Sequence, residues 1–578
     1  MHRPQFVATS LLPAAAGLLG LLFGCTADVT TPSSQTTGGM SSTGGSGMVD
    51  PPISTACASE LPASKRIVRL SFNQIANSIG SLLDRALGTT IVSEFELLDV
   101  DHRAFPPLQS PREGNSLTDQ SWNTVNRIAE SAGKHVFDNF MTATPCGAAP
   151  TDECAQQYLN TLAVKVYRRP LTPAEQTRLT GLYTNLKTGA GATINEAVQH
   201  GVYALFATPQ FLYRTEFGSD WRVDGALTSY ELASMLSYFL TDDAPDQPLL
   251  DAAAQNKLSN PAEIGTHVDR FLASDAAKVN LHGALVSYFS YPNLETVVIQ
   301  DDAFTGEMRK AMYQESKLFL QNTLWSAPLN ELLTSRKGYV NATLAPIYGV
   351  TFPPAGVTPD ATGFAQIELP ANRTGLLAQA GFLANRSRPN ETSVVGRGLL
   401  VKGALLCTQT PAPPAAIQDQ IEMVGQANPN ASERQLADIR AATSPCNTCH
   451  ASFDAYGLAL DSFDVLGRYR MADSEGRPID PSVTLPLEAG GGTAANVVEV
   501  ATKLAATGAF AKCMGMNLVN YALADVSAGA ADIGSCAADE VAKTFAANPD
   551  QSFSGLVKAV AVSAAFSSRS KGSEGVAQ

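Results

Sequence analysis

The sequence lacks several features that would place the protein in a common functional class. It has no long run of Lys or Arg, and its 40 basic residues are outnumbered by 54 acidic ones. A net charge of −14 disfavours binding along a phosphate backbone, so we expect no nucleic-acid partner. The sequence also contains no HExxH, no GxSxG, no phosphate-binding glycine loop and no GxGxxG after an expected strand. It therefore shows no motif of a zinc protease, an α/β-hydrolase or a nucleotide-binding enzyme.

Apolar runs of transmembrane length are missing after the N-terminus, which itself resembles an export signal. Arg3 precedes the apolar stretch "LLPAAAGLLGLLFG" at residues 11–24. The stretch ends in "LFGC", which resembles the lipobox of bacterial lipoproteins, so we expect residues 1–24 to be removed and Cys25 to be acylated. The alternative is an ordinary export signal followed by a chance cysteine. Residues 25–58 are rich in Ser, Thr and Gly and predict a flexible tether.

Cysteine is scarce but its number is informative. Nine cysteines are present, and setting aside Cys25, Cys446 and Cys449 leaves six, enough for three disulfides in an oxidising compartment. Local spacing favours pairs 146 with 154 and 513 with 536, which leaves 57 with 407. Some of the six could instead be buried thiols. The six candidates are Cys57, Cys146, Cys154, Cys407, Cys513 and Cys536.

The stretch "SPCNTCHASFDAYGLALDSFDVLGRYR" at residues 444–470 contains the pattern CxxCH. Ser444 and Pro445 are suited to the N-cap and first position of a helix. On such a helix Cys446, Cys449 and His450 share one face. Two thiols there can form thioethers with haem vinyl groups while the imidazole binds the iron, so the pattern predicts one covalent haem c with His450 as the proximal ligand.

Other interpretations of this cluster have less support from the sequence. A thioredoxin-type disulfide would follow a strand in a βαβ unit, and no such unit is indicated near residue 446. A structural zinc site would need a fourth ligand, and none occurs nearby. A plain structural disulfide would not need His450.

The sixth ligand of such an iron is left open by the sequence. A methionine would suit electron transfer, whereas an open position would permit ligand or peroxide chemistry. Methionine fills core gaps more often than it binds metal. The candidates are Met471, Met514 and Met516, with Met423 before the motif.

Length predicts several domains, and periodicity predicts that they are helical. At about 100–200 residues per domain, 578 residues are too many for one core. Apolar residues at helical spacing predict helices within residues 66–83, 193–218, 227–253 and 304–325. Thr228 and Glu231 form an expected capping box. Proline-rich joints occur at residues 105–111, 352–360 and 410–416.

We therefore expect a mainly α fold of several packed helical domains, with a cytochrome c-like haem-attachment segment in the C-terminal third. The CxxCH motif falls in the fourth of five expected domains. These span residues 59–150, 151–222, 223–365, 366–485 and 486–578.

The order of the segments resembles exported multi-domain proteins with a planctomycete-type cytochrome c motif, which are built from domains of unknown function. The resemblance extends from about residue 66 to 569. It rests on "RLSFNQIANSIGSLL", "VYRRPLTPAEQ", "ATPQFLYRTEFG", "LTSYELASMLSYFLTDDAPDQPLL", the 373–414 stretch, the CxxCH segment, "FAKCMGMNLVNYALAD" and "VSAAFSSR". Met235 stands where the family usually has Arg.

The resemblance is detailed around the CxxCH motif, where the family form is close to CxxCHxxMDPxGFALExFDxxGxWR. The attachment residues are intact. The residues that agree are Asp454, Gly457, Phe463, Asp464, Gly467 and Arg470, and those that depart are Phe453, Ala455, Asp461 and Tyr469. The resemblance implies export, haem and architecture, but no substrate.

The sequence thus supports two hypotheses of different classes. The first is a lipoprotein of the cell envelope, at the outer membrane or facing the periplasm. It would carry one haem c and act in electron transfer or haem-based oxidoreduction, with the membrane and a redox protein as partners. The second is a surface binding or scaffold lipoprotein in which the CxxCH segment is only a structural staple. The large helical body favours the second, because a single electron-transfer haem needs far fewer residues.

Overall fold

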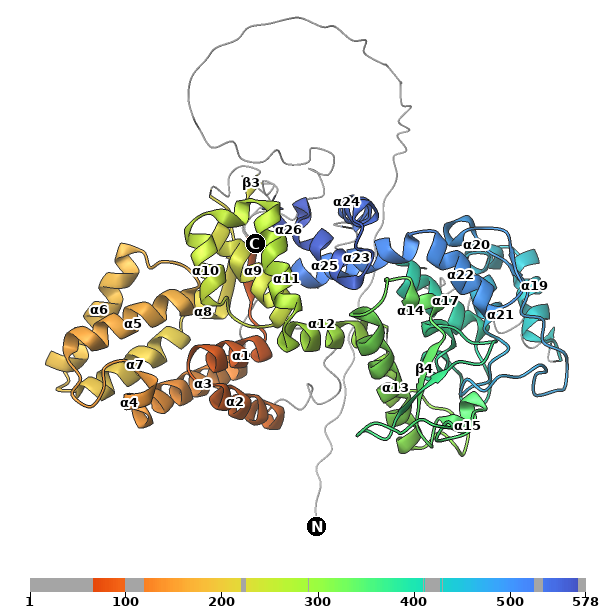
Figure 1. Ribbon diagram of the computed structural model, residues 1–578, viewed down its shortest axis with the longest axis horizontal. Coiled ribbons are helices and arrows are strands. Elements are labelled where there is room, and N and C mark those ends of the chain that lie inside the picture. Colours follow the sequence, from red (N-terminus) through yellow and green to blue (C-terminus); the bar gives the residue numbers. More distant parts are fainter. Residues whose placement is uncertain are drawn as a thin grey trace, which may run out of the picture. The chain divides into compact units, whose positions relative to one another are not determined.

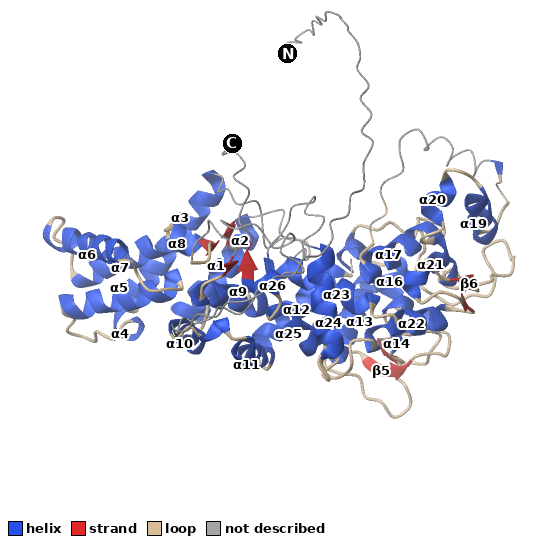
Figure 2. Cartoon of the chain, turned by 90° about the horizontal axis from the view of Figure 1, so that it is seen from above, coloured by secondary structure: helices blue, strands red, loops and turns tan. Residues whose placement is uncertain are grey.

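The computed structural model describes residues 66–98, 119–219, 225–289, 291–408, 410, 427–428, 430–523 and 534–569. The expectation of a mainly α fold is confirmed, since helices make up most of these residues and the strands are short (Figure 1, Figure 2). None of the helices in these ranges is both long and apolar enough to cross a bilayer. The predicted signal peptide and tether, with Cys25, Cys57 and Met423, lie outside the described residues.

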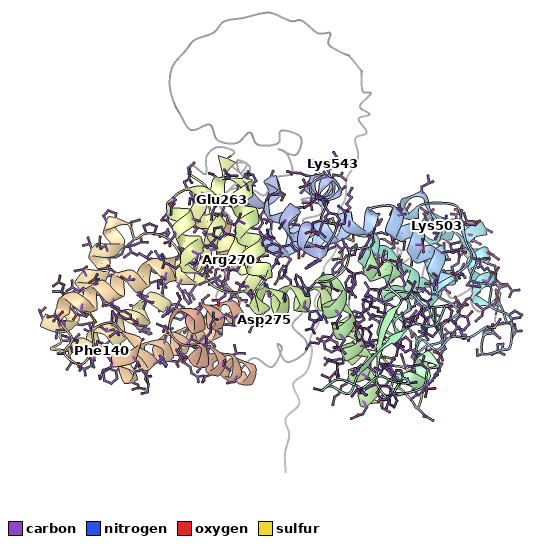
Figure 3. All side chains as sticks on the ribbon, in the orientation of Figure 1. Phe140, Glu263, Arg270, Asp275, Lys503 and Lys543 are labelled. Atoms are coloured by element: carbon purple, nitrogen blue, oxygen red, sulfur yellow. A yellow bond between two sulfur atoms is a disulfide. The ribbon has the colours of Figure 1, made fainter. Side chains whose placement is uncertain are left out.

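The first hydrophobic core lies in the N-terminal part of the described chain. Its helices are α1 (Phe72–Leu82), α2 (Arg85–Leu98), α3 (Asp119–Asp138), α4 (Phe140–Ala143), α5 (Asp152–Tyr167), α6 (Pro173–Thr188), α7 (Ile194–Phe206) and α8 (Pro209–Leu212). α7 packs on α3, α5 and α6, and α1 packs on α2. Their buried side chains form one cluster, which includes Phe140, labelled in Figure 3.

Two of the predicted helices are shorter than expected because short strands replace their ends. β1 (Arg66–Arg69) pairs antiparallel with β2 (Tyr213–Glu216). The predicted helix at 66–83 therefore begins only at α1, where Ser71 is the N-cap. The helix predicted at 193–218 ends with α7, because the residue before Pro209 avoids the helical region and is extended.

The second core contains the remaining helices. The first group is α9 (Ser229–Thr241), α10 (Gln247–Ala254), α11 (Pro261–Leu272), α12 (Asp275–Tyr288), α13 (Gly306–Leu324), α14 (Glu331–Thr334), α15 (Ala345–Tyr348), α16 (Ala380–Ala384) and α17 (Val394–Leu406). The second group is α19 (Glu433–Ala442), α20 (Cys446–His450), α21 (Asp454–Ala459), α22 (Val497–Ala506), α23 (Ala509–Leu523), α24 (Gly534–Ala547), α25 (Phe553–Ala561) and α26 (Ala564–Ser567). Their buried apolar side chains form one continuous cluster.

Short antiparallel pairs and single 3₁₀ turns join these helices. The pairs are β3 (Gly225–Ala226) with β8 (Ser568–Arg569), β4 (Lys337–Val340) with β5 (Ala365–Glu368), and β6 (Val483–Thr484) with β7 (Thr493–Ala494). The 3₁₀ turns are η3 (Lys257–Ser259), η4 (Tyr291–Glu295), η5 (Leu376–Ala378) and η6 (Leu487–Ala489). The β3–β8 pair brings the last described residues back to the start of the second core.

Helix starts in this chain are strongly specified by local sequence. In a capping box the cap side chain accepts from the N3 amide and the N3 side chain accepts from the cap amide, which satisfies two otherwise unpaired donors. The expected box at Thr228 and Glu231 is confirmed at the start of α9. The predicted helix at 227–253 nevertheless breaks after α9, where Asp242 is left-handed with φ of 56° and Asp246 caps α10. The helix predicted at 304–325 is α13.

The five expected domains share two cores. Residues expected in the 59–150 and 151–222 domains lie in the first core, which Tyr238 of α9 also enters. Residues from 223–365, 366–485 and 486–578 contribute to the second core. The boundaries between the domains remain predictions, because burial alone does not divide the chain at them.

Disulfides partly follow the expected pairing. Cys146 and Cys154 are joined, as local spacing predicts. Cys407 is joined to Cys513, with their Cα atoms 5.2 Å apart, so the expected pairs 513–536 and 57–407 are wrong. This pairing depends on tertiary packing, because Cys407 caps the end of α17 and α17 packs on α23, which carries Cys513. Cys536 is also disulfide-bonded. These bonds indicate folding in an oxidising compartment outside the cytoplasm.

Candidate functional site

The CxxCH residues form a short helix of their own. α20 consists of Cys446–His450 and packs on α19. The expected cap at Ser444 is wrong: Pro445 occupies the cap position and makes no side-chain capping hydrogen bond. The helix therefore starts one residue later than the sequence suggests, but the three attachment residues still lie on a single turn.

The two cysteines of this turn are not joined to each other. Cys446 is buried and Cys449 is half-buried, and both are free thiols. The same chain does form disulfides at Cys146–Cys154 and Cys407–Cys513. The sulfurs of α20 are thus available for another partner.

His450 makes a directed hydrogen bond through one ring nitrogen. Its Nδ1 lies 3.0 Å from Asp454 Oδ1, and the other carboxylate oxygen, Oδ2, accepts from Arg440 Nε at 3.0 Å. The imidazole also packs against the Phe453 ring, with centroids 4.9 Å apart. Because a carboxylate only accepts, Nδ1 carries the proton in the neutral ring and Nε2 keeps its lone pair. Nε2 makes no hydrogen bond to any described residue.

The three attachment residues do not converge as ligands of one bare metal ion. Within the described ranges, no group of three His, Cys, Asp or Glu side chains is placed to share such an ion. This geometry gives no support to the zinc alternative, which needs four ligands around one point. It is compatible with haem, whose attachment carbons and iron are separate atoms.

Glycines bring the following helix, α21, unusually close to α17. A Cβ added to Gly457 would lie 1.9 Å from the Val394 carbonyl oxygen, and one added to Gly398 would lie 2.3 Å from the Phe453 carbonyl oxygen. Any side chain at these positions would push the helices apart. The approach fixes the backbone at the start of α21, which carries Asp454.

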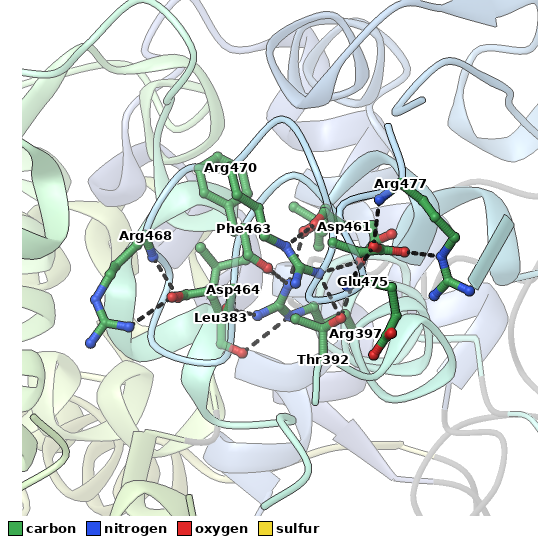
Figure 4. Close-up of polar contacts among 12 residues, drawn as sticks. Leu383, Thr392, Arg397, Asp461, Phe463, Asp464, Arg468, Arg470, Glu475 and Arg477 are labelled. Atoms are coloured by element: carbon green, nitrogen blue, oxygen red, sulfur yellow. Dashed lines mark hydrogen bonds and ion pairs between the residues drawn. The ribbon is translucent and has the colours of Figure 1, made fainter. Parts of the chain in front are cut away.

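A buried arginine holds the chain after α21. Arg397 of α17 is 1% exposed and donates to the carbonyl oxygens of Leu460 (2.8 Å), Phe463 (2.6 Å) and Asp464 (2.5 Å). Its Nε donates to Leu383 at 3.3 Å. Figure 4 shows Arg397 among Phe463, Asp464 and Leu383. Burial lowers the pKa of Arg397 to about 10. All four of its hydrogen bonds go to backbone carbonyl oxygens, so its role is structural.

Two further arginines fix the loop that follows. Arg470 donates to Asp461 Oδ1 at 2.9 Å, and Thr392 donates to the same oxygen at 3.1 Å. Arg468 donates to Asp464, as Figure 4 shows, and also to Asp301. The Arg468 guanidinium lowers the pKa of Asp301. Asp464 and Arg470, together with Asp461, thus support the loop after α21, and these hydrogen bonds go to residues outside α20.

Replacing Arg397 with lysine is expected to lower the free energy of unfolding by about 2 kcal/mol, because one ammonium group cannot reach all four carbonyl oxygens and leaves buried acceptors unpaired. Chemical denaturation of wild type and Arg397→Lys measures the difference. Arg468→Lys is the control, since Arg468 is 37% exposed and water can replace its lost bonds. Equal effects of the two substitutions would contradict the assigned role.

The candidate sixth ligands lie in different environments. Met471 is 77% exposed. Met514 is fully buried in the second core and Met516 is half-buried, both on α23, which packs chiefly on α24, α17 and α25. No substantial contact joins α23 to α20 in the described part of the chain. Assignment of any of these methionines therefore stays a prediction.

Sequence reasoning missed Arg440 and assigned no role to Asp454. Asp454 follows His450 by four residues, a spacing that often brings side chains together, so this contact had a detectable signal. Arg440 lies on the preceding helix, α19, and no local pattern points from it to the motif. Only the packing of α19 on α20 and α21 reveals it.

Comparison with known families gives three matches. Residues 154–216 match PSD5, a "Protein of unknown function (DUF1595)", and residues 227–350 match PSD4, a "Protein of unknown function (DUF1592)". Residues 373–473, which include α20 and Arg397, match PSCyt3, a "Protein of unknown function (DUF1588)". No curated protein and no solved structure matches the chain.

These matches confirm the resemblance in its second, third and fourth segments. The segments near residue 66 and after residue 510 are not covered by them, and their resemblance stays a prediction. The chain is thus a multi-domain protein with three successive segments that match families of unknown function.

Proposed function

We propose that the protein is an exported lipoprotein that carries one covalent haem c on α20 and acts in electron transfer or haem-based oxidoreduction. The proposal rests on the hydrogen bonding of the two ring nitrogens of His450. Its Nδ1 is engaged by Asp454 while Nε2 makes no hydrogen bond to the described residues, on the same turn as two free thiols. This is the tautomer that an iron ligand needs.

The residues around α20 fit the chemistry of haem. Cys446 and Cys449 would hold the haem through thioethers, and His450 would bind the iron. Arg440 Nη2 is buried without a hydrogen-bond partner among the described residues, although its Nε bonds Asp454. A haem carboxylate is one acceptor that would satisfy this donor. When bound, the group would supply an iron that cycles between two oxidation states.

The remaining parts of the proposal concern location and partners. Acylation of Cys25 would tie the chain to a membrane, with residues 25–58 as tether, at the outer membrane or on the periplasmic side. The disulfides agree with an oxidising compartment. A redox protein would exchange electrons with the haem, and the sixth iron position would be open or filled by Met471, Met514 or Met516.

A scaffold role, with α20 as a structural staple, is the competing proposal. Its disulfide form is not supported, because Cys446 and Cys449 are free thiols. A haem that only stabilises the fold would leave the chain with no redox partner. The helical packing outside α20 does not distinguish the two roles.

The decisive measurement is a pyridine haemochrome spectrum with a haem-stained denaturing gel, on protein made with a c-type maturation system. We expect covalent haem in wild type and its loss in the Cys446→Ala/Cys449→Ala double variant. The double variant Cys146→Ala/Cys154→Ala removes two distant cysteines and should keep its haem. Wild-type protein that is exported and folded but free of haem would refute the proposal.

A further inference from the structure

Asp454 lies between His450 and Arg440 and contacts each through a different oxygen. Oδ1 accepts from His450 Nδ1 at 3.0 Å, and Oδ2 accepts from Arg440 Nε at 3.0 Å. The exposed fractions of these side chains are 10% for Asp454, 17% for His450 and 14% for Arg440. The bond to the imidazole is thus largely shielded from water, where a hydrogen bond to a charged acceptor is strongest.

The backbone that carries Asp454 is held by tight packing against α17. Asp454 is the first residue of α21, and α21 lies directly on α17 at Gly457, with no room for a Cβ. Arg397 holds the chain at the other end of the same helix. The packing of α21 on α17 therefore helps to hold the Asp454 carboxylate next to Nδ1.

A carboxylate that accepts the Nδ1 proton makes the opposite nitrogen of a histidine more basic. A more basic ligand stabilises the oxidised, more positive state of a bound iron relative to the reduced state. Arg440 acts in the opposite sense, because its positive charge attracts electron density of the same carboxylate. Asp454 and Arg440 together therefore set how basic the Nε2 of His450 is.

We propose that Asp454, held by Arg440, is a positioning residue that fixes the tautomer of His450 and lowers the reduction potential of a haem bound there. The inference rests on the proposed function and deepens it, because it assigns the control of the redox state to two residues outside the CxxCH motif.

Asp461 provides a matched control for Asp454. Both aspartates lie in the same segment, and the side chains of Asp461 and Asp454 are 11% and 10% exposed. Asp461 contacts Arg470 and Thr392 and makes no hydrogen bond to His450. Changing either residue to asparagine removes one buried negative charge, but only Asp454→Asn weakens the acceptor of Nδ1.

The test measures the midpoint potential by spectroelectrochemistry and the haem content by pyridine haemochrome, in wild type, Asp454→Asn and Asp461→Asn. We expect a clear rise in potential in Asp454→Asn and a much smaller shift in Asp461→Asn, with covalent haem in all three. Equal shifts, or no shift, would overturn the positioning role while leaving the haem proposal intact. Absence of haem from wild type would instead refute the proposed function, and this inference with it.

Two further variants keep the inference testable if Asp454→Asn does not fold. Arg440→Gln removes the cation that competes for the carboxylate, so the potential should fall below that of wild type. Asp454→Glu keeps a carboxylate and should stay closer to wild type than the asparagine variant does. An unchanged or higher potential in Arg440→Gln would contradict the inference.

Discussion

Replacing Arg569 with methionine is expected to lower the free energy of unfolding by about 3–5 kcal/mol, because the change leaves a carboxylate buried without its main partner. The side chains of Arg569 and Glu216 are 2% and 0% exposed. Nε and Nη2 of the arginine both donate to Glu216 Oε2, at 2.9 and 2.6 Å. Removing the positive charge from a site that excludes water should therefore cost far more than losing a surface ion pair.

Arg569, the last described residue, contacts a residue much earlier in the chain. Arg569 belongs to β8, which pairs with β3, and Glu216 belongs to β2, which pairs with β1. Its Nη1 donates to the Ala565 carbonyl at 3.1 Å and to the Ser568 carbonyl at 2.6 Å. The ion pair thus joins residues that are 353 positions apart, on two different pairs of short strands.

Chemical denaturation of wild type, Arg569→Met and the double variant Arg569→Met/Glu216→Gln measures this effect. The double variant should recover part of the lost stability, because it no longer buries a carboxylate that has lost its main partner. Arg270→Met is the control: Arg270, labelled in Figure 3, pairs with Asp246 where both side chains are more than one-third exposed. A loss of under about 1 kcal/mol is expected there. Similar losses at Arg569 and Arg270 would contradict the prediction.

The sequence predicted what local interactions determine. Helical spacing identified α9 and α13, and the pair Thr228 and Glu231 identified the start of α9, because a capping box closes within four residues. Cys146 and Cys154 were paired correctly because only eight positions separate them. The strand β1 was missed, since its four residues are extended by pairing with β2 far along the chain.

The candidate site shows the same division between local and distant interactions. Cys446, Cys449 and His450 are found by a five-residue pattern. Arg440 and Arg397 are not, because they reach the segment from α19 and α17 through tertiary packing. The pairing of Cys407 with Cys513 was missed for that reason too, since it depends on α17 meeting α23.

Glu315 is a buried carboxyl group of the second core that no local sequence pattern singles out. It lies on α13, is 1% exposed and accepts a hydrogen bond from the Tyr348 hydroxyl. Tyr348 in turn accepts from the Ala380 amide at 3.0 Å, and the Arg373 guanidinium stacks on its ring. Burial raises the pKa of Glu315 from 4.5 to about 8, although the bond from Tyr348 and the charge of Arg373 oppose the rise. The folded protein therefore favours the protonated acid at neutral pH.

This shift predicts that Glu315→Gln becomes progressively more stable than wild type as the pH rises from 4.5 to 8. The raised pKa of Glu315 means that its contribution to stability is fully present below pH 4.5, where both states are protonated, and is lost as the pH rises towards 8. At about 1.4 kcal/mol per pH unit, wild type should lose about 5 kcal/mol across this window, a loss that the neutral amide avoids. Glutamine has the shape of the protonated acid, and Oε2, which has no hydrogen-bond partner among the described residues, is where its amide nitrogen would lie.

Denaturation curves at pH 5, 6, 7 and 8 for wild type and Glu315→Gln measure how the difference between their free energies of unfolding changes with pH. Glu175→Gln is the matched control, because Arg169 lowers the pKa of Glu175 to about 2 and that carboxylate is ionised in the folded protein at all four pH values. The contribution of the Glu175 carboxylate to stability is present above pH 4.5 and is lost only as the pH falls towards 2. The free energy of unfolding of Glu175→Gln should therefore differ from that of wild type by a constant amount between pH 5 and 8. A difference for Glu315→Gln that is equally flat between pH 5 and 8 would mean that Glu315 is ionised in the folded core, with Arg373 and Tyr348 compensating its charge.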